Sequence, residues 1–323
     1  MAGSKVKSKK DFLLKPPEDI IGWLLEGDPS IQFQTCRDLL DNSENLETMQ
    51  EKMAVSGWGK NLLDAFGADD KWGGGFYSPK WISTHYTLML LMRMGFPQSH
   101  EIPRRALQKY LDAMWYEDGG INVGVTSKSS DVCVTGMVLS LLCYFGFDDQ
   151  RMVGMIDYFK ARRLADGGWN CNYSGGDYHS SVHTTLSVLD GLERMKVYCP
   201  NRKADLEDLT QSGMKFLLDH KLYKSHTSGE VMKDSFTRFS FPPRWFFDVM
   251  KALDQFQTHG LSYDEGMRDA LELLLSKQTS TGKWRVQNKH AGRTHFEMEK
   301  TGAESRWNTL RAYRILKAYG GDL

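Results

Sequence analysis

Two residues of metal-binding type stand together where a helix is expected to begin. Asp131 and Cys133 precede an apolar run that ends at Gly146, a residue suited to terminate a helix. The pattern returns near residue 183, where His183 takes the place of the cysteine. We therefore expect these helices to direct Asp131, Cys133 and His183 toward one shared site. Structural roles stay open, because Asp131 could cap its helix and Cys133 could be a small core residue.

These helices belong to an internal repeat, in which a glycine turn precedes an apolar helix and a more polar helix follows. The turns are Gly74-Gly75-Phe76, Gly119-Gly120-Ile121, Gly167-Gly168-Trp169 and Gly282-Lys283-Trp284. When the apolar helices are aligned, one position carries Phe33, His85, Cys133, His183, Trp245 and Trp307. A spacing of about 50 to 60 residues indicates stacked helical hairpins that bury their apolar faces only against neighbours.

The repeat predicts two layers of helices. Inner, mostly apolar helices are expected to begin near residues 31, 83, 131, 181, 243 and 305, and residues 57–59 are expected to form a loop. Outer, amphipathic helices are expected over 101–115, 149–162, 202–220 and 263–277, with two further helices at 12–26 and 42–53. No alternating strand pattern is evident. We therefore predict an all-α (α/α)6 toroid, with residues 1–10 disordered and 11–323 forming a single domain.

The composition excludes some classes of protein. Lys plus Arg equals Asp plus Glu, at 41 each, which argues against nucleic-acid binding by phosphate neutralisation. Five cysteines without a disulfide-framework spacing favour free thiols in a reducing compartment, and we predict a cytoplasmic location. The basic N-terminus lacks the apolar segment of a signal peptide, and no apolar run is long enough to span a membrane.

The motifs resemble those of the terpenoid-cyclase and protein-prenyltransferase superfamily. The run from Gln278 through Gly282 to Trp284 is similar to the Gln-Trp repeat of squalene cyclases, and Asp166–Trp169 matches it in part, with Arg163 in place of the glutamine. The repeats extend from about residue 30 to 320. This resemblance implies the (α/α)6 toroid fold.

Two chemistries compete within that superfamily. Squalene-type cyclases protonate an alkene with the middle acid of an Asp-x-Asp-Asp motif, but here the segment is Asp131-Val-Cys-Val-Thr135. A thiol with an ordinary pKa of about 8.5 is too weak for that step. Prenyltransferase β subunits carry Asp-x-Cys here and a histidine about 50 residues later, which together bind the catalytic zinc. By resemblance, Asp131, Cys133 and His183 are therefore the predicted zinc ligands and catalytic residues.

Such a site would leave one zinc position open for a substrate thiol, which would attack an isoprenoid diphosphate. Lys128 matches a lysine that the family places near the diphosphate, whereas Val125 and Val134 replace family Arg and Tyr residues. Arg244 and Arg306 could supply the missing positive charge. His85 could be a ligand, a diphosphate donor or a hydrogen-bonded cavity histidine. Trp245 and Trp307 could hold an isoprenoid tail or simply fill the core.

The sequence therefore predicts a prenyltransferase-like zinc enzyme that acts on an isoprenoid diphosphate and a thiol acceptor. Family members of this kind need a partner subunit, so a protein partner is a further expectation. A terpenoid cyclase with an altered acid motif is one alternative. A non-catalytic toroid that binds an apolar small molecule or a protein is the other.

Overall fold

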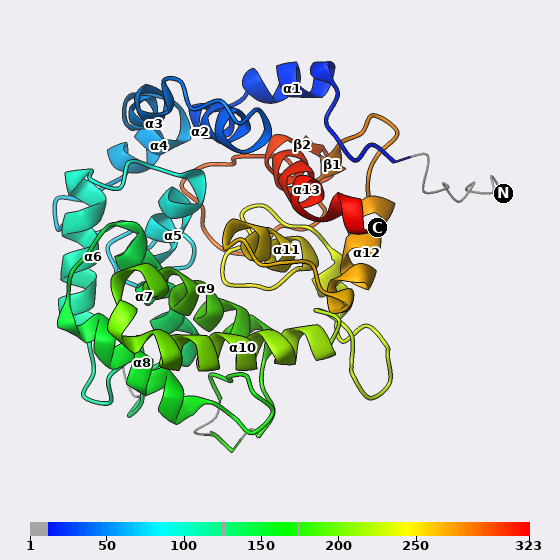
Figure 1. The fold of residues 1–323 in the computed structure, drawn as a ribbon. Coiled ribbons are helices and arrows are strands. Elements are labelled where there is room, and N and C mark those ends of the chain that lie inside the picture. Colours follow the sequence, from blue (N-terminus) through cyan, green and yellow to red (C-terminus); the bar gives the residue numbers. More distant parts are fainter. Residues whose placement is uncertain (1–11, 125–126, 173–174, 177) are drawn as a thin grey trace.

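The structure, a computed structural model, describes residues 12–124, 127–172, 175–176 and 178–323. Its helices form an inner and an outer layer around a common centre, and the chain alternates between the layers along most of its length (Figure 1). Strands within the described residues are limited to β1 (Trp284–Arg285) and β2 (Glu304–Ser305), which pair antiparallel. The all-α prediction is therefore confirmed. The segment predicted to be disordered, 1–10, lies outside the described residues.

The inner layer is made of helices that are buried on most sides. In α7, for example, each residue from Val134 to Cys143 is buried. The inner helices are α2 (Pro29–Gln34), α5 (Thr84–Met94), α7 (Val132–Tyr144), α9 (Val182–Tyr198), α11 (Val249–Thr258) and α13 (Arg306–Tyr319). A π-helical turn, η2 (Thr35–Leu39), continues α2.

The outer layer consists of amphipathic helices with charged outer faces. They are α1 (Glu18–Leu25), α3 (Leu46–Val55), α4 (Gly57–Asp64), α6 (Glu101–Met114), α8 (Gln150–Arg162), α10 (Lys203–Asp219) and α12 (Arg268–Ser276). Short 3-10 turns occur at η4 (Pro200–Arg202), η5 (Asp234–Thr237), η6 (Glu265–Met267) and η7 (Gly320–Asp322).

The first two helices and the last inner helix meet and close the ring. The last inner helix, α13, packs against α1 and α2 (Figure 1). The side chain of Gln278 also exchanges two hydrogen bonds of 2.9 Å with the backbone of Leu13. Because both edges of the helical array are covered by each other, no polar terminal repeat is required. The closed ring agrees with the toroid predicted from the repeats.

A buried tryptophan joins an outer helix to the next inner helix in three repeats. The indole N–H of Trp72, Trp169 and Trp284 donates to a carbonyl ten residues earlier, at 2.6, 2.8 and 2.8 Å. The backbone N–H of each tryptophan donates to a threonine hydroxyl in the first turn of the following inner helix. The turn glycines make this arrangement accessible; Gly167, for example, has φ +96°. In the first repeat Trp72 holds this place, rather than the predicted Phe76.

The helices α7 and α9 approach each other closely at two glycines. A Cβ atom on Gly136 would lie 2.7 Å from the carbonyl oxygen of Ser187, and one on Gly191 would lie 2.7 Å from the carbonyl oxygen of Gly136. Such distances are shorter than van der Waals contact, so side chains there would push the helices apart. These two helices therefore form the most closely packed part of the inner layer.

Several predicted boundaries are wrong for identifiable reasons. The fifth inner helix begins at Val249 rather than near 243, because Arg244 has φ +55°, outside the right-handed helical region, and the side chain of Asp248 caps the helix by accepting from the Lys251 N–H at 2.8 Å. Trp245 thus precedes its helix. The expected loop at 57–59 is the start of α4, and the helix expected from residue 12 begins only at Glu18.

No helix of the described residues is long and apolar enough to cross a membrane.

Candidate ligand cavity and the predicted metal site

Asp131 and Cys133 lie at the start of α7, as predicted. Asp131 occupies the N-cap position without a side-chain capping bond, and its carboxylate accepts a weak hydrogen bond from the Val123 N–H at 3.4 Å. Burial raises the pKa of this carboxyl. The Sγ of Cys171 accepts a hydrogen bond from the Cys133 backbone N–H at 3.1 Å. The Cys171 sulfur beside it and burial raise the pKa of Cys133.

His183 lies in the first turn of α9, but its ring contacts a different set of groups. Nδ1 accepts a hydrogen bond from the Phe247 N–H at 2.8 Å. The rings of Phe236 and Trp245 each lie 5.2 Å from the imidazole centroid. Burial, with help from the charge of Lys251, lowers the pKa of His183 to about 3, so the ring is neutral near pH 7. One nitrogen of this predicted ligand is therefore already occupied by a backbone donor.

The predicted zinc ligands do not gather into a metal site in this arrangement. Among the described residues, no group of three or more His, Cys, Asp or Glu side chains is placed to hold a metal ion. Because the donors present do not fit a zinc ion as they stand, we derive no chemical step through one. The zinc assignment stays a prediction without structural support.

The other predicted substrate-binding residues are dispersed. His85 is fully buried on α5, where Nδ1 shares a hydrogen bond of 3.1 Å with the Tyr110 hydroxyl, and burial lowers its pKa to about 3. Its Nε2 is buried and has no partner among the described residues. Trp245 stacks on Phe246 with 4.0 Å between ring centroids, whereas Trp307 stacks on Phe241 at 4.9 Å. The two tryptophans thus belong to separate aromatic clusters.

The three predicted cations differ in where they point. Arg306 contacts α1, because its Nε donates to the Trp23 carbonyl at 2.8 Å and its guanidinium lies 4.6 Å from the Trp23 ring centroid. Lys128 is exposed in the segment before α7. The guanidinium of Arg244 lies 5.6 Å from the Trp81 ring centroid, and burial lowers its pKa to about 10. These cations therefore do not form one diphosphate site around Asp131.

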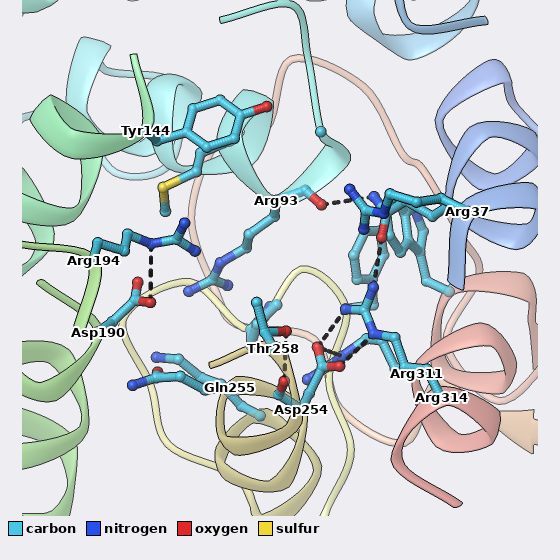
Figure 2. A pocket seen from close by; sticks show the side chains of 17 residues that line it. Arg37, Arg93, Tyr144, Asp190, Arg194, Asp254, Gln255, Thr258, Arg311 and Arg314 are labelled. Atoms are coloured by element: carbon cyan, nitrogen blue, oxygen red, sulfur yellow. Dashed lines mark hydrogen bonds and ion pairs between the residues drawn. The ribbon is translucent and has the colours of Figure 1, made fainter. Parts of the chain in front are cut away.

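A cavity of about 180 Å³ lies between the inner helices (Figure 2). On α7 and α9 it is lined by residues of later turns, such as Tyr144 and Asp190, and not by Cys133 or His183. The seven residues from His183 to Asp190 correspond to about 10 Å along the helix axis. Of the predicted residues, only Trp307 lines this cavity. Its lining is Gln34, Arg37, Met92, Arg93, Gly95, Tyr144, Asp190, Arg194, Phe241, Pro243, Lys251, Asp254, Gln255, Thr258, Trp307, Arg311 and Arg314.

Most charges in the cavity are paired with one another. Asp254 accepts from Arg311 Nε at 3.0 Å and from Arg314 Nε at 2.5 Å (Figure 2). Asp190 accepts from Arg194 Nε at 3.2 Å and lies 2.9 Å from His259 Nε2. The arginines hold the pKa of Asp254 below its usual range, despite burial. Both aspartates are therefore ionised near neutral pH and suited to orient cations, not to donate protons.

Arg93 is different, because it has no carboxylate partner among the described residues. It extends from the last turn of α5 across the cavity toward side chains of α9 and α11 (Figure 2). Its one side-chain hydrogen bond within the described structure is from Nη2 to the Arg244 carbonyl oxygen, at 3.0 Å. Burial, and then the charge of Arg311, lower its pKa to about 10. The remaining guanidinium donors face the cavity without a protein acceptor in the described residues.

Lys251 is a second cation without an ion-pair partner in the described part of the chain. It lies in the first turn of α11 and is only 9% exposed. Its Nζ donates to the carbonyl oxygens of Trp245 and Phe246 at 3.3 and 3.1 Å. Burial, and then the neighbouring Arg93 charge, lower its pKa to about 7. This amine therefore titrates near neutral pH in the absence of a ligand.

The cavity consequently carries an excess of positive charge. Six cations line it, and the carboxylates that line it or bond to these residues are Asp38, Asp190, Asp248 and Asp254. Two positive charges remain uncompensated when Lys251 is protonated. The indole N–H of Trp307 is also buried and lacks a partner among the described residues. Unpartnered donors of this kind are suited to bind a small anion.

The sequence interpretation missed Arg93 because it lies in the last turn of its helix, and missed Lys251 because this helix was predicted to begin near residue 243 rather than at Val249. A signal was available, because α5, α9 and α13 are otherwise buried helices that carry charged residues in their middle or last turns. A charge on an inner helix of a closed ring must be paired or face an interior cavity. Counting charges helix by helix would have identified this site.

Comparison with known proteins gives a distant similarity of fold. No protein-family model matches the chain, and no curated protein matches it. Among solved structures, the type II terpene cyclase MstE from Scytonema without ligand is similar with a TM-score of 0.46 and 14% identity, over 92% of this chain and 90% of that one. A variant of MstE in complex with geranylgeranyl dihydroxybenzoate (substrate) gives 0.45 and 13%, over 94% and 88%. A variant in complex with merosterolic acid A (product) gives 0.46 and 14%, over 91% and 87%. At these values residue roles do not transfer, and the fold assignment rests on the helices and contacts above.

Proposed function

We propose that the protein binds a small anionic molecule in the central cavity, and that a short isoprenoid diphosphate is the preferred ligand class. The observation that carries this proposal is the pair of cations, Arg93 and Lys251, that face the cavity without an ion-pair partner in the described residues. Keeping a cation in an interior without a counter-ion costs free energy, and a bound anion would remove that cost. The planar guanidinium of Arg93 suits the oxygens of a phosphate or carboxylate group.

The apolar part of the lining supports an isoprenoid tail, but a short one. Met92, Phe241, Pro243 and Trp307 provide apolar surface beside the cations. The cavity volume of about 180 Å³ is smaller than the roughly 300–1,000 Å³ of sites for drug-sized ligands. A diphosphate with a short tail is therefore a better match to this volume than a long isoprenoid chain.

The test is calorimetric titration at pH 6.5 with dimethylallyl diphosphate, inorganic diphosphate and dimethylallyl alcohol. We expect the first to bind most tightly, inorganic diphosphate to bind more weakly and the alcohol not to bind. Arg93→Met should weaken diphosphate binding by about 2 kcal/mol, or roughly 30-fold, which is typical for the loss of a charged hydrogen bond.

Lys203→Met is the matched control, because Lys203 is an exposed lysine at the start of the outer helix α10. It should leave binding unchanged. Absence of binding by each anion, or equal binding by wild type and Arg93→Met, would show that the excess charge has another role. Equal affinity for inorganic diphosphate and dimethylallyl diphosphate would retain the anion site and remove the isoprenoid assignment.

The predicted zinc-dependent transfer to a thiol requires its own test, because the described donors are not arranged around a common point. Elemental analysis of zinc-reconstituted wild type and Cys133→Ala distinguishes the cases. One zinc per chain that is lost in the variant would support the prediction, whereas no bound zinc would remove it.

Cyclisation is the remaining alternative from the sequence. It needs a carboxylic acid that keeps its proton, and the two carboxylates lining the cavity are ion-paired with arginines. Asp131, at the other end of α7, is the acid that the sequence retains from the cyclase motif, and burial raises its pKa. Conversion of a linear isoprenoid without an acceptor, abolished in Asp131→Asn, is the result that would support it.

A further inference from the structure

The sulfur atoms of Cys133 and Cys171 lie together at the start of α7. Cys171 Sγ accepts the backbone N–H of Cys133 at 3.1 Å, and the Cys171 thiol is close enough to the Cys133 thiol to raise its pKa. The hydroxyl of Thr184, in the first turn of α9, also donates to it at 3.5 Å. Contacts from two inner helices therefore hold the Cys171 sulfur against that of Cys133.

This arrangement distinguishes the two residues from the other cysteines. All five cysteines are free thiols in the structure, and Cys143 and Cys199 are buried. The thiol of Cys199 donates to the Asn201 side chain at 3.0 Å, so its partner is an oxygen. Cys36 is partly exposed, as are Cys133 and Cys171, but no described contact places a second sulfur beside it. Cys36 is therefore a suitable control, because it is a thiol of similar exposure without a neighbouring sulfur.

We propose that Cys133 and Cys171 form an oxidisable dithiol, a modification site at which a hydroperoxide converts the two thiols into a disulfide. One sulfur attacks the outer peroxide oxygen, the O–O bond breaks, and a sulfenic acid and an alcohol (water, for hydrogen peroxide) are formed. The second thiol then attacks the sulfenic sulfur, the S–O bond breaks, and water leaves as the S–S bond forms. The two thiols lose two electrons and two protons, and the peroxide gains them.

The disulfide would link the first turn of α7 to the segment after Trp169, across 38 residues of sequence. It would also consume the thiol of Cys133, one of the predicted zinc ligands. Neither sulfur lines the central cavity, so this dithiol is independent of the proposed anion site.

The experiment uses the full chain, treated with chelator and then with hydrogen peroxide at equimolar to fivefold amounts. Remaining thiols are blocked with N-ethylmaleimide, and non-reduced peptides are analysed by mass spectrometry. We expect a Cys133–Cys171 linked peptide that disappears after reduction, while Cys36 stays mostly alkylated. Cys36→Ser should give the same linked peptide at wild-type yield, and Cys171→Ser should give none and leave Cys133 unlinked.

Two results would overturn the proposal. One is that N-ethylmaleimide alkylates both Cys133 and Cys171 after peroxide treatment that oxidises Cys36, which would show that both thiols had stayed reduced. The other is that the linked peptide forms at least as readily in 8 M urea, which would show that the folded arrangement does not bring the thiols together. Because Cys133→Ser and Cys171→Ser could affect folding, the decisive peptides are those from wild type and Cys36→Ser.

Discussion

Replacing Lys251 by methionine should remove a specific part of the pH dependence of stability. The pKa of Lys251 is lowered to about 7 in the folded chain by burial and by the charge of Arg93, against about 10.4 in an unfolded chain. Between these values the unfolded state binds more protons than the folded state, so the free energy of unfolding rises with pH. Below pH 7 both states are protonated and this contribution is constant.

The magnitude follows from the two pKa values. From pH 6 to pH 9, titration of Lys251 should add about 2.7 kcal/mol to the free energy of unfolding of the wild type, and nothing to that of Lys251→Met. The charged groups that set this pKa come from four inner helices: Arg93 on α5, Asp190 on α9, Asp248 at the cap of α11 and Arg311 on α13. Lys251→Met also loses the Nζ hydrogen bonds to two backbone carbonyls. This loss changes the free energy of unfolding of the variant by an amount that varies little with pH above 7.

The assay is urea denaturation at pH 6, 7, 8 and 9 without phosphate or sulfate, for wild type, Lys251→Met and the exposed-lysine control Lys203→Met. The difference between wild type and Lys251→Met should change by about 2.7 kcal/mol over this range, whereas wild type and Lys203→Met should change in parallel. Other titrating groups are common to all three proteins; the Lys251 charge helps to lower the pKa of His183 and His290, but burial is the larger cause for both and is unchanged in the variant. If the free energies of unfolding of wild type and Lys251→Met change with pH in parallel, Lys251 keeps an ordinary pKa. That result would contradict the excess of positive charge in the cavity.

Three further predictions test other parts of the structure. Sulfate does not titrate in this range, and calorimetry should show that it binds the wild-type cavity more weakly at pH 9 than at pH 6. In Lys251→Met the affinity for sulfate should depend little on pH. An unchanged wild-type affinity would contradict a role for the Lys251 charge. Between pH 6.5 and 5 the wild type should lose about 1.6 kcal/mol of its free energy of unfolding through His85, because the His85 pKa is about 3 in the folded chain and about 6.5 in the unfolded chain. His85→Phe should remove this loss, as measured by urea denaturation at both pH values. Gly136→Ala should destabilise the chain by about 1–3 kcal/mol, since its Cβ would lie 2.7 Å from the Ser187 carbonyl oxygen. Gly22→Ala, whose Cβ would have no atom within 4 Å, should be neutral or stabilising. Equal effects of the two substitutions on stability would refute the close packing of α7 and α9.

The sequence predicted the helical layers well because their signals are local. Apolar periodicity and glycine turns identified α5, α7, α9 and α13 to within a few residues, and the Trp169 and Trp284 turns join outer and inner helices as the repeat implied. The exceptions involve competition between local signals. At residues 242–248 the aligned aromatic pattern favoured a helix at Pro243, but the positive φ of Arg244 is incompatible with a helix there, and the capping side chain of Asp248 sets the start at Val249.

The candidate site was harder to predict because it depends on side-chain partners far apart in sequence. Cys133 has the type and helical position of a metal ligand, yet its neighbour is Cys171, 38 residues away in a loop. His183 has a suitable position too, but the backbone N–H of Phe247, 64 residues later, occupies its Nδ1. Alignment of repeats shows which helix turn a residue occupies, and it does not show which way the ring or sulfur points.

A zero net charge for the whole chain concealed the most informative electrostatic feature. The surface ion pairs cancel one another in solvent and contribute little to specificity, whereas the inner layer concentrates six cations around one cavity with four carboxylates in contact. Asp254, Asp190 and Asp38 form ion pairs with the other four arginines, whereas Arg93 and Lys251 have no ion-pair partner among the described residues. Because desolvation makes such charges costly, their retention on two different inner helices argues that both serve one ligand. The distribution of charge between the layers, rather than its sum, is therefore the basis of the proposed anion site.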